Sequence, residues 1–219
     1  MSHSRGPKDT RRSLQTRFPV SPIIANRWSP RAFDPRMPEA SKLGSLFEAS
    51  RLAPSAHNAQ PARFILTRKG QGTGYERLFA CLDPKNQVWA HTAPVLALGA
   101  VMKRRFSQVK GDFVPYSHFM HDLGLAVMSI LLQARAVDLF AHPLAAFDPD
   151  QARAAFAVPA LYEPAIVLAV GYLGTDEALP QDVRDRERED RHRLPLEEIL
   201  FEEDWGVASG LLTGPVDAA

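Results

Sequence analysis

One segment, residues 117–138, most constrains how this chain can fold, because it reads as a long helix with almost no polar side. Apolar residues occupy nearly every direction around its axis: Leu123, Leu125, Ala126, Val127, Ile130, Leu131, Leu132, Ala134 and Val137. A helix that is apolar nearly all round must be covered on several sides. In a chain of 219 residues, we therefore expect this helix to lie in the core and also to form a subunit interface.

The order of the other main elements indicates the class of fold. Apolar runs rich in β-branched and small residues predict three buried strands: residues 63–67, 93–102 and 165–170. Helical spacing and end signals predict three further helices: residues 38–52, 75–80 and 149–157. Residues 142–147 read as a tight connector before the helix cap Asp148. Because strands and helices do not alternate strictly, an α+β fold is favoured over a doubly wound parallel sheet.

Bulk properties narrow the class of protein. A formal net charge of +1 argues against a general nucleic-acid binder. The single cysteine, Cys81, excludes an intramolecular disulfide and suits a reducing cytoplasm. No apolar run approaches the roughly 18 residues of a membrane helix, and residues 1–16 lack the apolar part of a secretory signal. We expect a cytoplasmic protein with a flexible tail at residues 1–18 and a second tail at residues 207–219.

A stiff polar loop follows the first predicted helix. Residues 53–64 read Ala-Pro-Ser-Ala-His-Asn-Ala-Gln-Pro-Ala-Arg-Phe, and Pro54 and Pro61 disfavour helix on either side of the polar run. Such a connector between two regular elements is suited to present groups to a ligand.

Two pairs of arginines are candidates for anion binding. Arg27, Ser29 and Arg31 stand at alternate positions, which point the same way in an extended segment. Arg191 and Arg193 repeat this spacing near the other end of the chain. The groups could converge on a phosphate, although on spacing alone a solvated basic loop is the commoner explanation of such a pattern.

Other chemistry is weakly indicated. His118, His121 and Asp122 share a helix face, but such residues more often cap or solvate a helix end, so we predict no metal. Residues 103–115 are a candidate mobile flap or a plain surface linker. No Ser–His–Asp set and no glycine-rich nucleotide loop stands out. Arginine pairs, an amide-bearing loop and small-residue connectors instead suit a phosphate-bearing aromatic cofactor that supplies the reactivity itself.

Five motifs in order resemble those of the FMN-dependent nitroreductase family. They are Arg27-x-Ser29-x-Arg31, Ala53-Pro54-Ser55-x-x-Asn58-x-Gln60-Pro61, Ala93-Pro94-Val95, Gly171-Tyr172 and Arg191-x-Arg193-x-Pro195-Leu196-Glu197. The resemblance spans residues 23–205. It implies a mostly antiparallel sheet flanked by helices in residues 19–206, and an intertwined homodimer with two FMN sites at the interface.

The resemblance also implies site residues. Arg27, Ser29, Arg191 and Arg193 would bind the phosphate, and Arg31 would place a cation near the N1/O2 side of the flavin. Ser55 and Asn58 would come from the opposite subunit, and the backbone of Leu144 and Ala145 would face flavin N5 and O4. The cofactor-binding set is completed by residues beside these motifs: Trp28, Pro54, Ala56 and Gly171.

The implied activity is a ping-pong hydride transfer, in which NADPH or NADH reduces FMN and the flavin reduces a small organic acceptor of the nitroaromatic or quinone type. Three residues, at two places in the chain, depart from the family pattern. Ala145 and Ala146 stand where glycine is frequent, and Ala62 stands where tryptophan is common. The change at Ala62 keeps an alternative open, a flavin-binding or flavin-sensing dimer without efficient turnover.

Overall fold

The computed structural model describes residues 14 and 16–213. The chain divides into a larger unit, residues 27–188, and a smaller unit, residues 1–26 with 189–219. Residues 1–13, 15 and 214–219 lie outside the described part, and with them most of the expected N-terminal tail and half of the C-terminal one. The predicted domain at residues 19–206 includes parts of both units and stays a prediction.

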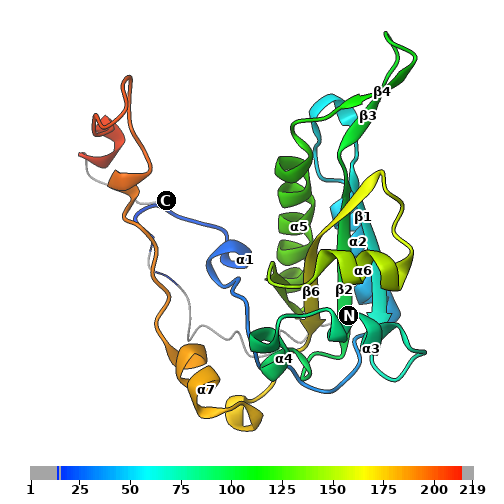
Figure 1. Ribbon diagram of the computed structural model, residues 1–219. Coiled ribbons are helices and arrows are strands. Elements are labelled where there is room, and N and C mark those ends of the chain that lie inside the picture. The colour runs from blue at the N-terminus through cyan, green and yellow to red at the C-terminus, as the bar shows by residue number, and fades with distance from the viewer. Residues whose placement is uncertain (1–13, 15, 214–219) are drawn as a thin grey trace, which may run out of the picture. The chain divides into compact units, whose positions relative to one another are not determined.

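The larger unit is built on a four-stranded sheet in the order β1-β2-β6-β5 (Figure 1). Its strands are β1 (Ala62–Arg68), β2 (Val95–Met102), β5 (Phe140–Leu144) and β6 (Tyr162–Gly171). All three neighbouring pairs are antiparallel. The α+β class and the mostly antiparallel sheet are therefore confirmed.

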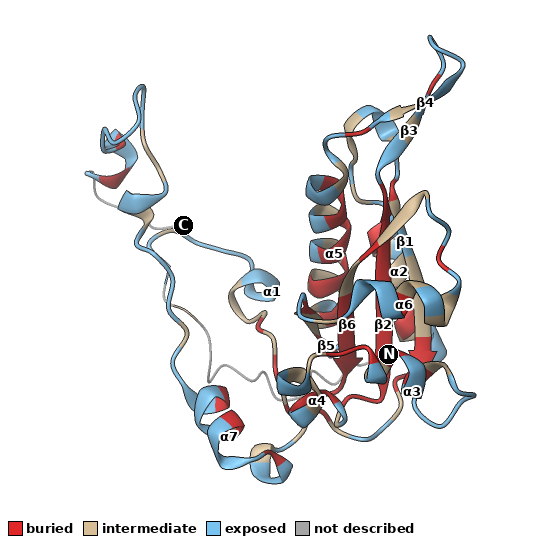
Figure 2. Ribbon diagram, viewed as in Figure 1, coloured by how far each residue is buried: buried red, intermediate tan, exposed pale blue. Residues whose placement is uncertain are grey.

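Helices cover both faces of this sheet. Every residue of β2 is buried (Figure 2), so its side chains enter two cores in alternation. One core joins the sheet to α2 (Ala40–Arg51) and α5 (Phe119–Ala136). The other joins it to α3 (Gly74–Ala80), α4 (Pro84–Ala90) and α6 (Pro149–Phe156).

The long helix α5 confirms the predicted segment to within two residues at each end. One side of it is buried against α2 and the sheet. Its opposite side carries Met120 and Met128, which are 51% and 37% exposed, and Gly124, where an added Cβ would meet no atom within 4 Å. Positions four apart lie on one helix face, so an apolar stripe of α5 is left uncovered within the larger unit.

The structure corrects the predicted connector at residues 142–147. Residues 142–144 belong to β5, an edge strand paired with β6. A proline in a strand is confined to an edge or a bulge because it cannot donate a ladder hydrogen bond. Pro143 therefore argued against a strand in the sequence, but β5 tolerates it because β5 lies at the edge of the sheet.

The helix α4 is absent from the prediction. It begins like α6: Asp83 caps it by accepting a hydrogen bond from Lys85 N (2.9 Å), and Pro84 follows the cap. The same Asp-Pro signal at Asp148, whose Oδ1 accepts from the backbone N of Asp150 and Gln151, did predict α6. The sequence therefore contained the same capping signal for α4 as for α6.

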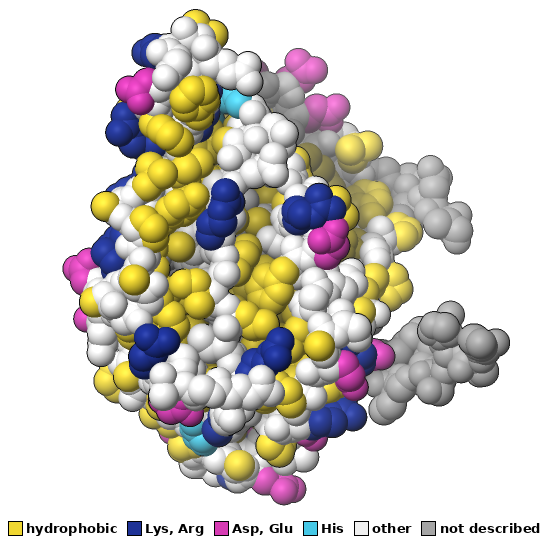
Figure 3. Space-filling view, turned by 90° about the vertical axis from the view of Figure 1, so that its right-hand side faces the viewer, with side chains coloured by type: hydrophobic (Ala, Val, Ile, Leu, Met, Phe, Trp, Pro, Cys, Tyr) yellow, Lys and Arg dark blue, Asp and Glu magenta, His cyan; other side chains and the backbone are white. Residues whose placement is uncertain are grey.

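The remaining elements are short. Residues 103–115, the candidate flap or linker, form a hairpin of β3 (Arg104–Ser107) and β4 (Asp112–Pro115). The larger unit also contains η1 (Ala56–Asn58), η2 (Asp176–Ala178) and α7 (Gln181–Arg188), and the smaller unit contains α1 (Pro22–Ala25), η3 (Leu196–Glu198) and η4 (Gly210–Leu212). Within the described residues, no helix combines the length and apolarity that crossing a membrane requires. On the face drawn in Figure 3, Lys and Arg side chains are spread among hydrophobic and uncharged ones.

Candidate functional site

The segment that carries the first arginine pair alternates strictly in burial. Trp28, Pro30 and Ala32 are buried, whereas Arg27, Ser29 and Arg31 are partly exposed. The Arg27 guanidinium donates to Ser29 Oγ at 3.4 Å. This is the geometry expected of an extended segment, in which residues two apart point the same way.

Backbone hydrogen bonds hold this segment against the end of β6. Asp34 N donates to the Tyr172 carbonyl (3.0 Å), and Gly174 N donates to the Ala32 carbonyl (3.1 Å). Thr92 Oγ1 also holds this segment, since it accepts from Phe33 N and lies within hydrogen-bonding distance of the Arg31 carbonyl, both at 3.2 Å. The backbone around Arg31 is thus fixed by the sheet core.

Arg31 opens onto a polar pocket of about 310 Å³ in the larger unit. The pocket is lined by Arg31, Asp83, Lys85, Asn86, Trp89, His142, Ala146 and Arg186. The buried carboxylate of Glu187 accepts from Arg31 N (3.0 Å) and lies 3.5 Å from the guanidinium. This contact orients Arg31 and also offsets part of its charge.

The start of α4 forms another wall of the same pocket. The Ala146 carbonyl accepts from Asp83 N (3.2 Å) and from Asn86 Nδ2 (3.0 Å), which joins the end of β5 to α4. Leu144, the last residue of β5, is buried, and Ala145 is exposed. Sequence reasoning missed Lys85 and Asn86 because it missed α4, although the Asp83-Pro84 cap could have indicated that helix.

His142 lies beside Arg31 as a neutral side chain. Its Nδ1 donates to the Pro30 carbonyl (2.8 Å), and its ring stacks on Trp89 with centroids 4.5 Å apart. Burial lowers the pKa of His142 to about 4. The positive charges of Arg31 and Arg27 lower this pKa further, whereas the hydrogen bond to Pro30 raises it. Because a carbonyl only accepts, Nδ1 carries the hydrogen and Nε2 is left as an acceptor.

This histidine makes stability depend on pH. Above pH 6.5, the pKa of His142 in the unfolded state, the side chain is neutral in both states and does not change the free energy of unfolding. Between pH 6.5 and pH 4, His142 is protonated only in the unfolded state. We expect this group to reduce the free energy of unfolding, by at most about 3 kcal/mol, as pH falls through that window. Urea unfolding at pH 7 and pH 4.5 measures the loss, and His142→Gln, which keeps a donor for Pro30, should lose less. Equal losses in both proteins would contradict this assignment.

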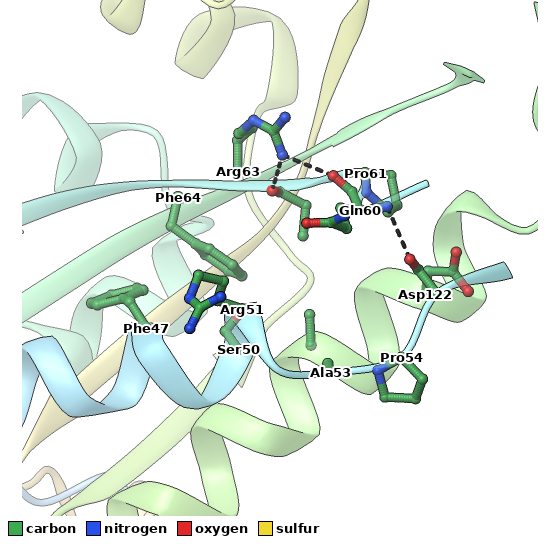
Figure 4. Close-up of a pocket in the computed structure, with 13 residues that line it drawn as sticks. Phe47, Ser50, Arg51, Ala53, Pro54, Gln60, Pro61, Arg63, Phe64 and Asp122 are labelled. Atoms are coloured by element: carbon green, nitrogen blue, oxygen red, sulfur yellow. Dashed lines mark hydrogen bonds between the residues drawn. The ribbon is translucent and has the colours of Figure 1, made fainter. Parts of the chain in front are cut away.

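The polar loop at residues 53–64 lines a second pocket, of about 280 Å³ (Figure 4). Phe47 and Phe64 form one wall, with ring centroids 5.5 Å apart. The other lining residues come from α2, the loop and α5: Ser50, Arg51, Ala53, Pro54, Ser55, Gln60, Pro61, Ala62, Arg63, Asp122 and Ala126. Ala62 faces the same core as Phe64, so the small side chain at this position leaves space beside the two rings.

Three residues of the loop hold left-handed backbone conformations. They are His57, Asn58 and Gln60, with φ of 56°, 53° and 46°. Such conformations cost roughly 1–3 kcal/mol for a non-glycine residue, least for asparagine. Strain of this size persists only where surrounding contacts hold the backbone.

Asp122 of α5 supplies such a contact. Its side chain is 1% exposed and accepts hydrogen bonds from Ala56 N (3.1 Å), His121 Nδ1 (3.0 Å) and the Tyr116 hydroxyl. Burial alone would raise the pKa of Asp122, but the hydrogen bonds from Tyr116, His121 and Ala56 outweigh it and lower the pKa. The described residues include no group of three or more His, Cys, Asp or Glu side chains arranged to hold a metal.

The predicted site residues fall into three sets. Arg27, Ser29 and Arg31 lie on the segment beside the polar pocket, whereas Pro54, Ser55, Ala56 and Asn58 lie on the loop. Among the described residues, the two pockets share no lining residue. Arg191 and Arg193 belong to the smaller unit, where Arg191 donates to the Ala25 carbonyl (2.9 Å). The joint phosphate clamp of Arg27, Ser29, Arg191 and Arg193 therefore stays a prediction.

Two further predicted residues are packed inside the larger unit. Trp28 is buried edge-on against Phe140, with ring centroids 5.7 Å apart. Gly171 ends β6, and a Cβ there would meet Pro94 at 2.8 Å and Phe33 at 3.1 Å. Its missing side chain makes room for protein atoms, so a role next to a cofactor ring rests on the resemblance alone.

Comparisons with known proteins decide the family. The family model described as the nitroreductase family matches residues 24–82. A solved structure, an oxidoreductase containing FMN, is 30% identical, with a TM-score of 0.81 over 88% of this chain and 96% of that chain. The chain belongs to the nitroreductase family.

Two curated relatives each match about two thirds of this chain. An uncharacterized 15.4 kDa protein of Mycolicibacterium smegmatis is 31% identical over 150 residues, 66% of this chain and 97% of the relative. A protein of Polynucleobacter asymbioticus named "Putative NADH dehydrogenase/NAD(P)H nitroreductase" is 26% identical over 157 residues, 65% of this chain and 79% of the relative.

Proposed function

We propose that this protein is an FMN-dependent oxidoreductase that uses NADH or NADPH to reduce a small organic acceptor of the nitroaromatic or quinone type. The observation that carries the proposal is the polar pocket beside Arg31, on the fold of the nitroreductase family. The solved relative with 30% identity contains FMN, and the name of the Polynucleobacter relative supports a nicotinamide as the reductant.

The side chains of the pocket fit the polar edge of a flavin. That edge presents carbonyl oxygens that accept hydrogen bonds and one N–H that donates. Arg31 and Lys85 supply donors with positive charge. The Asn86 amide donates one hydrogen bond to the Ala146 carbonyl, and its oxygen can accept a hydrogen bond from a ligand. His142 Nε2 is a second acceptor.

Each part of the pocket then has a proposed role. When bound, FMN supplies the capacity to accept a hydride from the nicotinamide and to pass reducing equivalents on to the acceptor. Arg31 would place positive charge near the N1/O2 side of the flavin and so stabilise the electron-rich ring. The backbone of Leu144 and Ala145 would face the bound ring, while Trp28 and Gly171 would support the site through their packing on Phe140, Pro94 and Phe33.

The phosphate of FMN is assigned to Arg27 and Ser29, together with Arg191 and Arg193. Arg27 and Ser29 already lie within hydrogen-bonding distance of each other, and an anion would take donors from both. Arg191 and Arg193 complete the proposed clamp from the smaller unit. Because Cys81 is a buried free thiol, a reducing cytoplasm remains the proposed location.

A homodimer is part of the proposal. The loop with Ser55 and Asn58 lines a different pocket from Arg31, so these groups would serve a flavin held by the partner subunit. The uncovered stripe of Met120, Gly124 and Met128 on α5 supports an interface there. Sedimentation should give twice the mass of one chain, and Met128→Glu should shift it toward one chain; a wild-type monomer would contradict this part.

The activity has a direct test. The purified protein should be yellow or become so with FMN, and anaerobic NADH or NADPH should bleach its visible flavin absorbance. A panel of quinones and nitroaromatics should then restore the absorbance. Protein that stays colourless after reconstitution with FMN would overturn the proposal, and bound flavin that resists both nicotinamides would favour a binding or sensing role.

A further inference from the structure

The carboxylate of Asp122 joins three separate parts of the larger unit. It lies on α5 and accepts a hydrogen bond from Ala56 N in the loop (3.1 Å) and another from Tyr116, the residue after β4. Tyr116 is fixed from its other side, because its backbone N donates to the Lys103 carbonyl (2.9 Å). A buried carboxylate that receives several donors is a rigid anchor.

The anchored peptide starts the strained part of the loop. Tyr116 Oη lies 3.0 Å from the Ala56 carbonyl, so both polar atoms of Ala56 lie beside the Asp122–Tyr116 pair. The left-handed residues His57, Asn58 and Gln60 follow directly and are exposed. The far side of the loop is closed by Gln60 N, which donates to Ser55 Oγ at 2.9 Å.

The loop is therefore anchored at Ala56, and its polar apex, with Asn58 and Gln60, is exposed to solvent or a ligand. Gln60 Nε2 donates to Asn58 Oδ1 (3.0 Å), which orders the exposed amides relative to each other. Without an anchor, left-handed residues relax to more favourable backbone conformations. The direction in which Ser55 and Asn58 point thus depends on the contact between Ala56 and Asp122.

We propose that Asp122 is a positioning residue that, with Tyr116, fixes the 53–61 loop so that Ser55 and Asn58 reach the flavin bound by the partner subunit. The inference rests on the proposed function. In this role, Asp122 acts through the peptide of Ala56, to which its carboxylate is hydrogen-bonded. Since Tyr116 follows the β3–β4 hairpin, the hairpin and the loop share one anchor.

Amide hydrogen exchange of the FMN-loaded protein tests the anchor. Asp122→Ala removes the acceptor, and exchange across residues 53–61 should accelerate at least tenfold. Asp122→Asn keeps one oxygen that can accept from Ala56 N, so it should restore most of the protection. Tyr116→Phe, a milder variant should Asp122→Ala not fold, should accelerate exchange by a smaller factor. Ser129→Ala on the same helix is the matched control and should exchange like wild type.

Flavin binding tests the positioning role separately. Asp122→Ala and Tyr116→Phe should weaken FMN binding severalfold or shift the visible flavin spectrum, whereas Ser129→Ala should do neither. The inference, but not the proposed function, would be overturned if Asp122→Ala and Tyr116→Phe exchanged at wild-type rates. It would also be overturned if the loop exchanged faster while flavin affinity and spectrum stayed unchanged. Wild-type protein that binds no FMN would instead overturn the proposed function.

Discussion

Replacing Gly174 by alanine is expected to lower the free energy of unfolding by about 2–4 kcal/mol. A Cβ at this position would lie 2.6 Å from Phe33 O and 2.7 Å from Asp34 N, and real Cβ atoms do not approach backbone this closely. The backbone must therefore separate, which weakens the hydrogen bonds from Gly174 N to Ala32 and from Asp34 N to Tyr172. Those bonds hold the segment that carries Arg31, so flavin affinity should fall as well.

Gly44→Ala is the matched control in the same unit. Gly44 lies inside α2, and an added Cβ there would meet no atom within 4 Å. Alanine at such a helix position should stabilise by up to about 1 kcal/mol. Urea unfolding of both variants and wild type gives the comparison. A Gly174→Ala protein as stable as wild type would show that the Phe33–Gly174 contact is loose.

Exchanging Arg31 for glutamine should weaken FMN binding by a factor of about 10–150, because a charge-assisted hydrogen bond is worth roughly 1.5–3 kcal/mol. Glutamine still offers a donor to the buried Glu187 carboxylate, which Arg31 contacts at 3.5 Å. The loss therefore reports on charge in the pocket more than on folding. Fluorescence titration of the flavin-free protein with FMN measures it.

Two controls separate the charge of Arg31 from general effects. Arg31→Lys keeps the positive charge and should bind FMN more tightly than Arg31→Gln. Arg68→Ala removes a cation that bonds Gln71 outside the pocket (3.2 Å) and should leave the affinity unchanged. Equal affinities for wild type and Arg31→Gln would remove Arg31 from the proposed site.

Periodic and capping signals explain how much of the fold was predictable. The apolar pattern of α5 and the continuous apolar run of β2 are local, and each predicted its element to within two residues. Pro143 masked β5, because whether a proline is tolerated depends on the position of the strand at the sheet edge. The cap at Asp83 carried enough information for α4, and its omission was an error of interpretation.

For the candidate site too, some features were predictable from the sequence and others were not. The alternation of Arg27, Ser29 and Arg31 was predictable because an extended backbone sets side-chain direction locally. The contribution of Lys85 and Asn86 was not, since it depends on the hydrogen bond that brings α4 to Ala146. For Asp122, the sequence suggested helix-end solvation or a weak metal candidate, while the structure makes it the anchor of Ala56.

The sequence by itself determined the fold class, the core helix and the family resemblance, because these follow from local periodicity and from motifs that are contiguous in the chain. Only the tertiary structure decided that β5 is an edge strand, that Arg31 shares a pocket with the start of α4, and that the 53–61 loop belongs to a second pocket. These features arise from packing and hydrogen bonds between residues far apart in the chain, and no local pattern encodes them.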